Sequence, residues 1–461
     1  MKTTVSPPSA ALSSLSRSLA PRHLTMISIG GMIGAGLFVA SSAAIAAAGP
    51  AIVLSYLIAG AVVLLIMRML GEMAVAMPNI QSFADFARAG LGHWAGFTVG
   101  WLYWFFWIVV VPVEAIAGAK LLQLWLPLPM WELGLALVAI MTVVNLMSAR
   151  SFGEFEFWFA SIKVAAIIVF IALAASVVFG LSGRPALGFG NLTSHAGFMP
   201  FGPIAVFAGV TTVFFSLAGA EIVTIAAAES SQPAQAVARL TSSVVWRILI
   251  FYVGSILLIV TVIPWDSIVP GHSPFTSALQ AMHVRFAGTI MSLIILTAVL
   301  SCLNSCFYVT SRVLFALAKQ GDAPIWLVKT SANRVPRRSV MLGSIAGVAG
   351  VLADLWSPNG VFAFLINASG ALFLFIYIAI AASQIRLRYA RQAAGKRQPS
   401  LQMWLFPWAS YLGVAAMIAV LTAMAMTPQL SQELWVSLLT VAVALIAFAL
   451  LRFWRRMAQG R

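Results

Sequence analysis

Long apolar stretches recur along the chain from Leu24 to Leu451, with only short polar connections between them. Each is long enough to cross a hydrocarbon layer roughly 30 Å thick as a helix. The pattern predicts an all-α integral membrane protein with twelve transmembrane helices. The predicted spans cover residues 24 to 45, 50 to 77, 94 to 127, 131 to 148, 154 to 181, 201 to 228, 242 to 264, 286 to 319, 339 to 355, 358 to 386, 403 to 426 and 430 to 453.

The connections between these spans are too short to fold by themselves, because a domain needs at least about 50 residues. Function is therefore expected inside the bundle. Residues 1 to 23 are rich in Ser, Ala and Pro and show no secretory signal peptide. We expect them to form a disordered cytoplasmic tail, and residues 454 to 461 to form a second tail.

The composition excludes a water-soluble protein, since 61% of the residues are hydrophobic and 8% are charged. The net charge of +15 raises the question of a nucleic-acid partner. In the predicted topology Lys120, Arg184 and Arg285 lie on one side, Lys163 lies within the membrane, and all other Lys and Arg residues lie on the opposite side. This asymmetry follows the positive-inside rule and predicts that both termini are cytoplasmic. Because the charges are spread over loops, no nucleic-acid partner is expected.

The cysteines and histidines, which commonly bind metals, show no metal-binding pattern in this sequence. Cys302 and Cys306 are four residues apart on one apolar helix, which is not the spacing of a redox pair. The five histidines fall in loops or at the ends of spans. We therefore predict no metal, no disulfide and no cofactor.

Two spans contain residues that disfavour a continuous helix. The first carries the glycine-rich stretch from Gly30 to Phe38, and glycine is about 1 kcal/mol less favourable than alanine in a helix. The sixth carries small residues, a glycine and a carboxylate from Phe215 to Glu221. The two stretches hold corresponding places in successive groups of five spans, residues 24 to 181 and residues 201 to 386.

Matching interruptions indicate a transporter site formed by broken helices. Unwound backbone in a membrane is tolerated where it lines a cavity or is buried in protein. Exposed amides attract a carboxylate and exposed carbonyls attract an ammonium group, so such a site suits an amino acid. For the first span a second interpretation stays open, in which Gly30 and Gly34 form a helix-packing face. A dinucleotide fingerprint is excluded by the spacing and by the lack of a preceding strand.

Three of the ionisable residues inside spans stand out, because an ionisable residue at the bilayer centre disfavours insertion by at least about 2.5 kcal/mol. Lys163 is far from a span end and is the main candidate for proton coupling; a lysine paired to a buried acid for structural reasons is the alternative. Glu221 either shapes the sixth span or relays protons, and we count it with Lys163 as a proton-coupling candidate. Glu114 either meets a substrate ammonium group or pairs with a neighbour.

The chain resembles the amino acid transporter family of the amino acid–polyamine–organocation superfamily over residues 20 to 455, and the γ-aminobutyrate (GABA) permeases in particular. The resemblance is carried by MRMLGEMAVAMP from Met67, WAGFTVGWLYWFFWIVVVPVEA from Trp94, GEFEFWFASIKV from Gly153, GAEIVTIAAAES from Gly219, SCLNS from Ser301 and GDAP from Gly321. It implies a 5+5 inverted-repeat core of the leucine-transporter type at residues 24 to 386, with discontinuous helices 1 and 6. Helices 11 and 12 then follow at residues 403 to 453.

The resemblance also implies a substrate site. It places the substrate carboxylate at the amides of Ile33, Gly34, Ala35 and Gly36, and the ammonium group at carbonyls near Met32 and Ala218. Phe215 matches an aromatic gate, and Lys163 matches a fifth-helix lysine that replaces a sodium ion. Cys302 and Asn304 match pore-facing positions, with a packing face of small residues as the alternative. Relatives outside the family carry a serine at the position of Ala35, so carboxylate binding here would depend on backbone groups.

These features together predict a proton-coupled importer of GABA in a bacterial inner membrane, with the proton as the coupling ion and no enzymatic activity. The same mechanism with proline, an aromatic amino acid or alanine is the nearest alternative, and a non-transporting amino acid sensor is a further one. The intramembrane residues include neither a nucleophile with a base nor a carboxylate pair, which would indicate an enzyme. They also show no repeated filter motif, which would indicate a channel. The sequence leaves the oligomeric state open and is compatible with a monomer.

Overall fold

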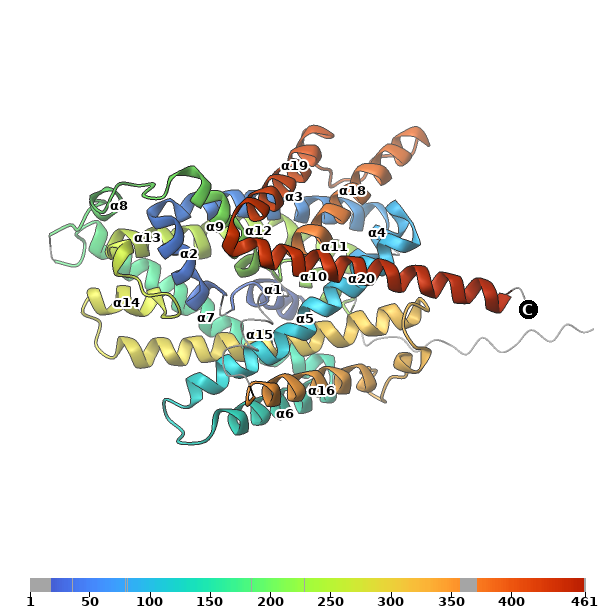
Figure 1. Cartoon of the computed structure of the whole chain (residues 1–461), viewed down its shortest axis with the longest axis horizontal. Helices are drawn as coiled ribbons and strands as arrows, with labels where there is room; N and C mark the ends of the chain where they lie inside the picture. Colours follow the sequence, from blue (N-terminus) through green and yellow to red (C-terminus); the bar gives the residue numbers. More distant parts are fainter. Residues whose placement is uncertain are drawn as a thin grey trace, which may run out of the picture.

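The structure, a computed structural model, describes residues 18–34, 36–78, 80, 82–183, 185–227, 229–356 and 371–459. These residues form helices joined by turns and loops, and none of them lies in a strand (Figure 1). The all-α prediction is therefore confirmed for this part of the chain. Several predictions fall on residues outside these ranges: the tail up to residue 17, Ala35, Arg184 and the start of the span at 358.

Most of the helical residues belong to long helices that run through the bundle. These are α3 (Ile52–Ala76), α5 (His93–Leu122), α6 (Met130–Met147), α7 (Ala149–Val178), α15 (Ala287–Lys319), α16 (Arg337–Ala353), α18 (Leu372–Ala393), α19 (Trp408–Met426) and α20 (Pro428–Gln459). A further continuous helix is made of α12 (Val244–Arg247), the π-helical segment η3 (Ile248–Gly254) and α13 (Ser255–Val262).

Two helices are interrupted, as the sequence predicts. The first consists of α1 (Pro21–Gly30), the π-helical turn η1 (Gly36–Ala40) and α2 (Ser41–Ala48). The second consists of α9 (Gly202–Leu217) and α10 (Ile222–Ala227). Short elements connect the rest: η2 (Gly49–Ala51), α4 (Phe83–Leu91), α8 (Asn191–Ser194), α11 (Pro233–Ser242), η4 (Trp265–Ser267), α14 (Pro274–Ala281) and η5 (Ile325–Val328).

Nine segments of the described chain are helical over at least 18 residues and apolar enough to cross a membrane. One of them, Gly36–Ala76, includes both the second half of the first interrupted helix and α3. The interruptions leave α1 with 10 residues and α9 with 16, and α16 has 17, so these helices fall below that length. The chain is thus a multi-pass membrane protein, while the count of twelve spans remains a prediction.

Several span boundaries differ from the prediction for local reasons. α5 ends at Leu122, before the predicted residue 127; turns follow up to Leu126, where Pro127 disfavours helical backbone. α7 begins at Ala149, before the predicted residue 154, because the Ser148 side chain accepts a hydrogen bond from the amide of Ser151 at 3.0 Å and caps the helix. α1 begins at Pro21, so the predicted tail is shorter by three residues, since proline is well suited to a first helical position.

Helix α5 lies near the centre of the bundle and contacts α4, α6, α15, α16 and α20. α1 packs on α7, and α3 packs on α9 and α11. α20 lies at the periphery, where it contacts α5 and α19 and runs to the C-terminal end of the described chain (Figure 1). The two interruptions therefore lie inside the bundle, surrounded by other helices.

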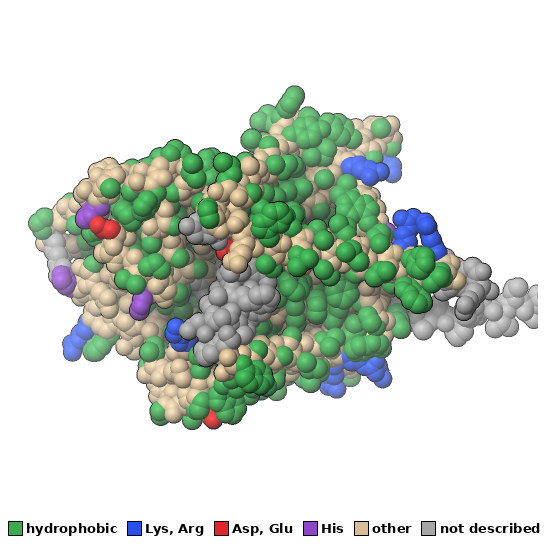
Figure 2. Space-filling model, viewed as in Figure 1, with side chains coloured by type: hydrophobic (Ala, Val, Ile, Leu, Met, Phe, Trp, Pro, Cys, Tyr) green, Lys and Arg blue, Asp and Glu red, His purple; other side chains and the backbone are tan. Residues whose placement is uncertain are grey.

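The outer surface is largely apolar. Figure 2 shows hydrophobic side chains over much of the visible face, and most of the visible Lys and Arg side chains near the end where α20 finishes. Large apolar side chains on peripheral helices are well exposed, among them Trp158, Leu412 and Leu439 at 64, 65 and 64%. Such a surface is stable when acyl chains cover it, as expected of a membrane protein.

Candidate functional site

The first interruption leaves part of the backbone of helix 1 without helical hydrogen bonds. Helical geometry ends at Gly30 and resumes at Gly36. The amides of Met32 and Ile33 both reach back to the carbonyl of Ile29, each at 3.3 Å. The amide of Gly34 has no hydrogen-bond acceptor among the described residues. This segment therefore presents backbone groups that are available to other partners.

The second interruption depends on a glycine. Gly219 follows the end of α9 and has φ +106°, a conformation that side-chain-bearing residues rarely adopt. A Cβ atom at Gly219 would lie 2.1 Å from the carbonyl oxygen of Gly31. The two interruptions thus touch each other through their backbones, and glycine is required for that contact. The structure therefore favours broken helices over a simple packing face at the first span.

Lys163 of α7 reaches the end of α1. Its Nζ donates hydrogen bonds to the carbonyl oxygens of Gly30 at 2.5 Å and Ile33 at 2.6 Å, and to the hydroxyl of Ser301 at 2.8 Å. The side chain is fully buried. The three donors of the ammonium group are therefore all used. One of them holds the carbonyl of the last residue of α1, and another holds a carbonyl within the first interruption.

Glu156 is a buried carboxylate that the sequence interpretation missed. It lies on the same helix as Lys163, and its Oε1 accepts a hydrogen bond from the Ser301 hydroxyl at 2.6 Å. Its Oε2 has no hydrogen-bond partner in the described structure. Gly30 packs directly against this carboxylate, since a Cβ atom there would lie 2.5 Å from Oε1. Lys163, Ser301 and Glu156 therefore form a continuous buried polar chain next to the first interruption.

A signal for Glu156 was present in the sequence. Glu156 and Lys163 are seven residues apart, which places them on one face of a helix. The predicted span begins at residue 154, which places Glu156 within its first turn. The earlier start of α7 at Ala149 places it deeper.

Glu221 lies at the second interruption. Its carboxylate accepts hydrogen bonds from the Tyr103 hydroxyl at 3.0 Å, the Tyr377 hydroxyl at 2.9 Å and the Gly219 amide at 3.2 Å. The hydrogen bond from the Gly219 amide to the Glu221 carboxylate fixes the turn that separates α9 from α10. Glu221 is fully buried, and the two tyrosines come from α5 and α18.

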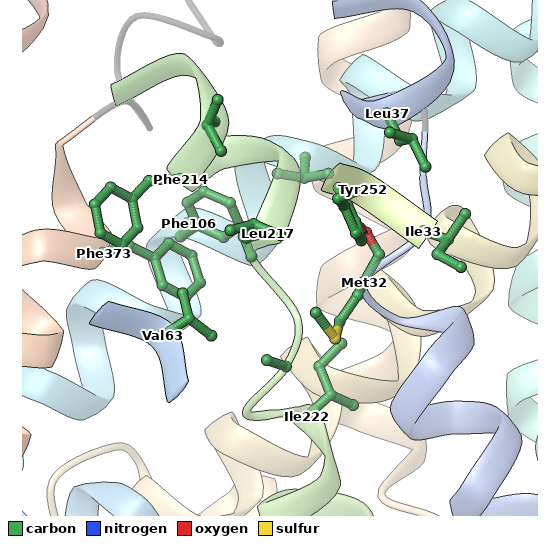
Figure 3. Close-up of a cluster of buried hydrophobic side chains, with 14 of the residues drawn as sticks. Met32, Ile33, Leu37, Val63, Phe106, Phe214, Leu217, Ile222, Tyr252 and Phe373 are labelled. Atoms are coloured by element: carbon green, nitrogen blue, oxygen red, sulfur yellow. Dashed lines mark hydrogen bonds between the residues drawn. The ribbon is translucent and has the colours of Figure 1, made fainter. Parts of the chain in front are cut away.

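Tyr252 of η3 links the two interruptions from a third element. Its hydroxyl lies 2.5 Å from the carbonyl oxygen of Met32 and 3.0 Å from that of Ser216, and it donates to either. Figure 3 shows Tyr252 beside Met32, with Leu217 and Ile222 on the two sides of the second interruption. Nothing in the local sequence around this tyrosine distinguishes it from other aromatic residues in apolar spans.

A small cavity lies between the interruptions. It has a volume of about 30 Å³ and is lined by Gly31, Met32, Gly34, Gly36, Phe106, Trp107, Val110, Glu114, Ser216, Ala218 and Cys302. This volume is much smaller than the roughly 300–1,000 Å³ of ordinary ligand sites. A bound amino acid would therefore require the surrounding helices to move apart.

Glu114 contributes the charged side chain of this lining. It is 4% exposed, and its Oε2 has no hydrogen-bond partner among the described residues. The Gly34 amide and the Glu114 carboxylate thus place an unused donor and an unused acceptor in the lining of one cavity. Such a pair has the polarity needed for the carboxylate and the ammonium group of a zwitterion.

The predicted site residues are distributed as follows. Met32, Gly34, Gly36, Glu114, Ala218 and Cys302 line the cavity. Ile33 and Asn304 lie behind it: the carbonyl of Ile33 is held by Lys163, and Asn304 accepts a hydrogen bond from Asn145 at 2.9 Å. Ala35 and the side chain of Phe215 lie outside the described part of the structure. Trp107, Phe106, Val110 and Ser216 are lining residues that the sequence did not reveal.

Comparison with known proteins identifies relatives over most of the chain. The model of the family described as amino acid permease matches residues 23–457. A γ-aminobutyric acid permease of Bacillus subtilis is 44% identical over 442 residues, covering 95% of this chain and 94% of that protein. A probable GABA permease of Pseudomonas aeruginosa is 47% identical over 440 residues, covering 94% and 92%. The aromatic amino acid transport protein AroP of Corynebacterium glutamicum is 41% identical over 415 residues, covering 89% of each chain.

The interrupted helices, the apolar surface and these relatives define a multi-pass membrane transporter. The chain belongs to the amino acid permease family. The relatives are named as permeases and transport proteins, in agreement with the expectation that the chain is a transporter and not an enzyme. The predicted family resemblance is confirmed.

Proposed function

We propose that the protein imports GABA together with protons by alternating access. The observation that carries this proposal is the unused donor of Gly34 and the unused acceptor of Glu114 in the lining of one cavity, between two broken helices. The relatives that are named as GABA permeases give the most specific indication of the substrate. The cavity is small in this structure, so binding GABA would require the helices around it to move apart.

The two polar groups suggest how the substrate lies. Its carboxylate would accept a hydrogen bond from the amide of Gly34 and from neighbouring backbone amides of the first interruption. Its ammonium group would meet Glu114. The carbonyl of Met32 is a weaker candidate for the ammonium group because the Tyr252 hydroxyl already lies 2.5 Å from it. This orientation places both charged ends of GABA against groups that otherwise lack partners.

Lys163 is the proposed proton-coupling residue. Its Nζ donates to the carbonyls of Gly30 and Ile33, so a proton gained or lost by Lys163 changes the charge at the point where helix 1 is interrupted. Loss of its proton would remove a donor from this region and loosen α1 from α7. Ser301 and Glu156 would then offer a route for the proton. Glu221, with its three hydrogen bonds, is better suited to holding the second interruption in shape than to moving protons.

The proposed architecture has twelve spans, with a core of five plus five helices in inverted repeats and two further helices at the C-terminal end. Both termini would face the cytoplasm of a bacterium, and the chain would lie in the inner membrane. The asymmetric distribution of Lys and Arg residues supports this orientation. The proton is the only coupling species that the proposal requires.

An aromatic amino acid is the second candidate substrate. It is favoured by the 41% identity to AroP and by the two aromatic side chains, Phe106 and Trp107, in the cavity lining. An aromatic substrate would need a larger expansion of the cavity than GABA does. The two candidates therefore differ in a way that competition by size can measure.

The test uses purified full-length protein in liposomes with an imposed pH gradient, acidic outside. We expect saturable uptake of labelled GABA that collapses when a protonophore is added. Unlabelled ω-amino acids of increasing chain length should compete best at the length of GABA, whereas strongest competition by phenylalanine or tyrosine would favour the aromatic substrate. Binding of GABA without any uptake would indicate a sensor and overturn the proposal.

The coupling role has its own test. Lys163→Ala should abolish uptake driven by the pH gradient while the protein remains monodisperse and binds GABA. Undiminished gradient-driven uptake in this variant would exclude Lys163 as the coupling residue. The substrate assignment would then stand or fall by the competition series alone.

A further inference from the structure

A second hollow lies away from the cavity between the interruptions, at the end of the bundle where α20 finishes. It is an open groove of about 630 Å³, lined by His93, Trp94, Phe448, Leu451, Arg452, Arg455 and Arg456. This volume is within the roughly 300–1,000 Å³ of ordinary ligand sites. The groove runs between the start of α5 and the last turns of α20, outside the substrate site described above.

The basic side of the groove carries charges that the protein does not neutralise. Arg452 and Arg456 are four residues apart, so they share one face of α20. Both are exposed, and neither has an acidic or hydrogen-bonding partner among the described residues. Arg455 is partly engaged: it donates to the carbonyl of Gly321 and lies 4.0 Å from Oδ1 of Asp322. At least two guanidinium groups are therefore free to bind an anion.

The other side of the groove is apolar. Phe448 packs edge-on against the ring of His93, with the ring centres 5.1 Å apart, and Leu451 and Trp94 complete the wall. Trp94 is 46% exposed. A free phosphate or an acidic peptide would gain little from such a wall, whereas a molecule with both an anionic and a hydrocarbon part would contact all of it.

The surface next to the groove indicates where that hydrocarbon part comes from. Only 17% of the most apolar window of α20 is buried inside the protein. Leu450, Phe453 and Trp454, which flank the arginines in sequence, are 54, 56 and 66% exposed. The groove therefore opens directly onto the apolar surface that acyl chains cover, at the level where that surface gives way to charged residues.

We infer that this groove binds one anionic phospholipid, with its phosphate on Arg452 and Arg456 and its acyl chains along α20 and the start of α5. Arginine is suited to this role because its planar guanidinium group forms paired hydrogen bonds with phosphate oxygens. Basic pockets between transmembrane helices are a recurrent way of recognising anionic headgroups. The apolar wall and the open lipid-facing side select a lipid over a soluble phosphate.

The site also has a connection into the bundle. Asp322, which follows α15, accepts from Arg88 of α4 and lies 2.7 Å from Nε2 of His93. Arg455 completes the basic groups around this buried carboxylate. A lipid phosphate near Arg455 and His93 would share these donors with Asp322. A lipid bound in the groove would therefore change the contacts that hold α4, α5 and the end of α15 together.

The test measures lipid retention by the purified full-length protein. Delipidated protein is titrated with phosphatidylglycerol or with phosphatidylethanolamine carrying identical acyl chains, and bound lipids are counted by native mass spectrometry. We expect the first site to prefer phosphatidylglycerol by at least roughly tenfold. Equal retention of the two lipids by the wild-type protein would overturn the inference without any variant.

Two double variants locate the site. Arg452→Gln with Arg456→Gln should remove the preference. Arg337→Gln with Arg386→Gln removes the same charge from exposed arginines that also lack partners in the described structure and lie outside the groove, and should leave the preference unchanged. Equal effects of the two double variants would show a general charge effect and overturn the inference.

The source of the anion is tested separately. Excess glycerol 3-phosphate should fail to displace bound phosphatidylglycerol from the wild-type protein. Full displacement would mean that the groove takes a soluble phosphate and would overturn the assignment to a lipid. GABA uptake is not used as the readout, so the outcome is independent of the proposed transport function.

Discussion

Lys163 and Glu156 lie seven residues apart on α7, and the hydroxyl of Ser301 joins them, accepting from Nζ of Lys163 at 2.8 Å and donating to Oε1 of Glu156 at 2.6 Å. Both side chains are fully buried. The same ammonium group holds two carbonyls at the first interruption. The charge state of this pair is therefore directly linked to the shape of the broken helix that lines the cavity.

The first prediction concerns Glu156. Glu156→Gln keeps the size of the side chain and removes the negative charge on the far side of Ser301. We expect GABA uptake driven by a pH gradient to fall by at least roughly tenfold, because a change of about 1.4 kcal/mol in a barrier already has that effect. Exchange of labelled for unlabelled GABA, which needs no net proton movement, should be less affected. Uptake and exchange are compared in the same liposomes.

Glu154→Gln is the matched control for this variant. Glu154 lies two residues earlier on α7, and its side chain is 33% exposed and pairs with Arg22. Exposed ion pairs contribute only about 0–1 kcal/mol, so this change should leave both uptake and exchange near the wild-type level. If the two substitutions reduced gradient-driven uptake equally, the polar chain through Ser301 would have no special role.

The second prediction concerns the contact between the interruptions. Gly219→Ala should destabilise the protein by roughly 3 kcal/mol or more, since the backbone has φ +106° and the new methyl group would meet the carbonyl of Gly31. Gly288→Ala is the control, because a methyl group at this position of α15 meets no atom within 4 Å. It should be neutral or stabilise by up to about 1 kcal/mol. Thermal unfolding in detergent measures both, and an unchanged midpoint for Gly219→Ala would contradict the contact.

The third prediction concerns Tyr252. Tyr252→Phe leaves the buried carbonyls of Met32 and Ser216 without this donor, which should destabilise the protein by about 1–3 kcal/mol and slow GABA uptake. Tyr56→Phe serves as the comparison, because the Tyr56 hydroxyl is buried with no hydrogen-bond partner in the described structure and its ring lies 6.1 Å from that of Tyr252. Removing that hydroxyl should have little effect. The reverse order of effects would exclude Tyr252 as a link between the interruptions.

The fourth prediction concerns pH and stability at Asp85, which lies on the short helix α4 outside the spans. Burial raises the pKa of this carboxyl from 3.8 to about 6; the neighbouring Arg88 lowers the pKa and Asp322 raises it. A carboxyl whose pKa is higher in the folded state destabilises that state once it is ionised. The destabilisation is full above pH 6 and is lost as the pH falls toward 3.8.

Asp85→Asn tests this dependence. It removes the ionisable group and keeps an oxygen that can accept from Gln320, the present donor to Asp85. At pH 7.5 we expect the variant to be more stable than the wild type by on the order of 3 kcal/mol, since one pKa unit corresponds to about 1.36 kcal/mol. Near pH 4 the difference should vanish. A constant difference across this range, measured by thermal unfolding, would assign the effect to something other than ionisation.

The sequence predicted the positions of most helices because a membrane span has a strong local signal. α15 begins and ends within one residue of its predicted limits of 286 and 319. The boundaries of α5 and α7 were less accurate, since a hydropathy pattern registers neither the turns before Pro127 nor the cap formed by Ser148. The count of twelve spans has a different difficulty. Each half of an interrupted helix is shorter than a membrane span when it is measured as a continuous segment.

The sequence indicated the site residues mainly where an ionisable side chain lies in an apolar span. Lys163 and Glu114 were candidates because ionisable residues are rare within a membrane. The structure places Glu114 in the cavity lining and Lys163 against the first interruption. Ser301 and Tyr252 could not be found in this way, because a serine or tyrosine in a span is common. Their importance comes from the partners they reach, which are distant in the sequence.

The amino-acid sequence by itself determined that this chain crosses a membrane many times and that helices 1 and 6 are interrupted. Both properties follow from local composition, since apolar length favours insertion and glycine disfavours helix. The tertiary structure alone decided that the two interruptions touch through Gly31 and Gly219 and that Lys163, Ser301 and Glu156 form one polar chain. These relationships depend on how helices far apart in the sequence pack, because a buried polar group is stable only where another element supplies its partner.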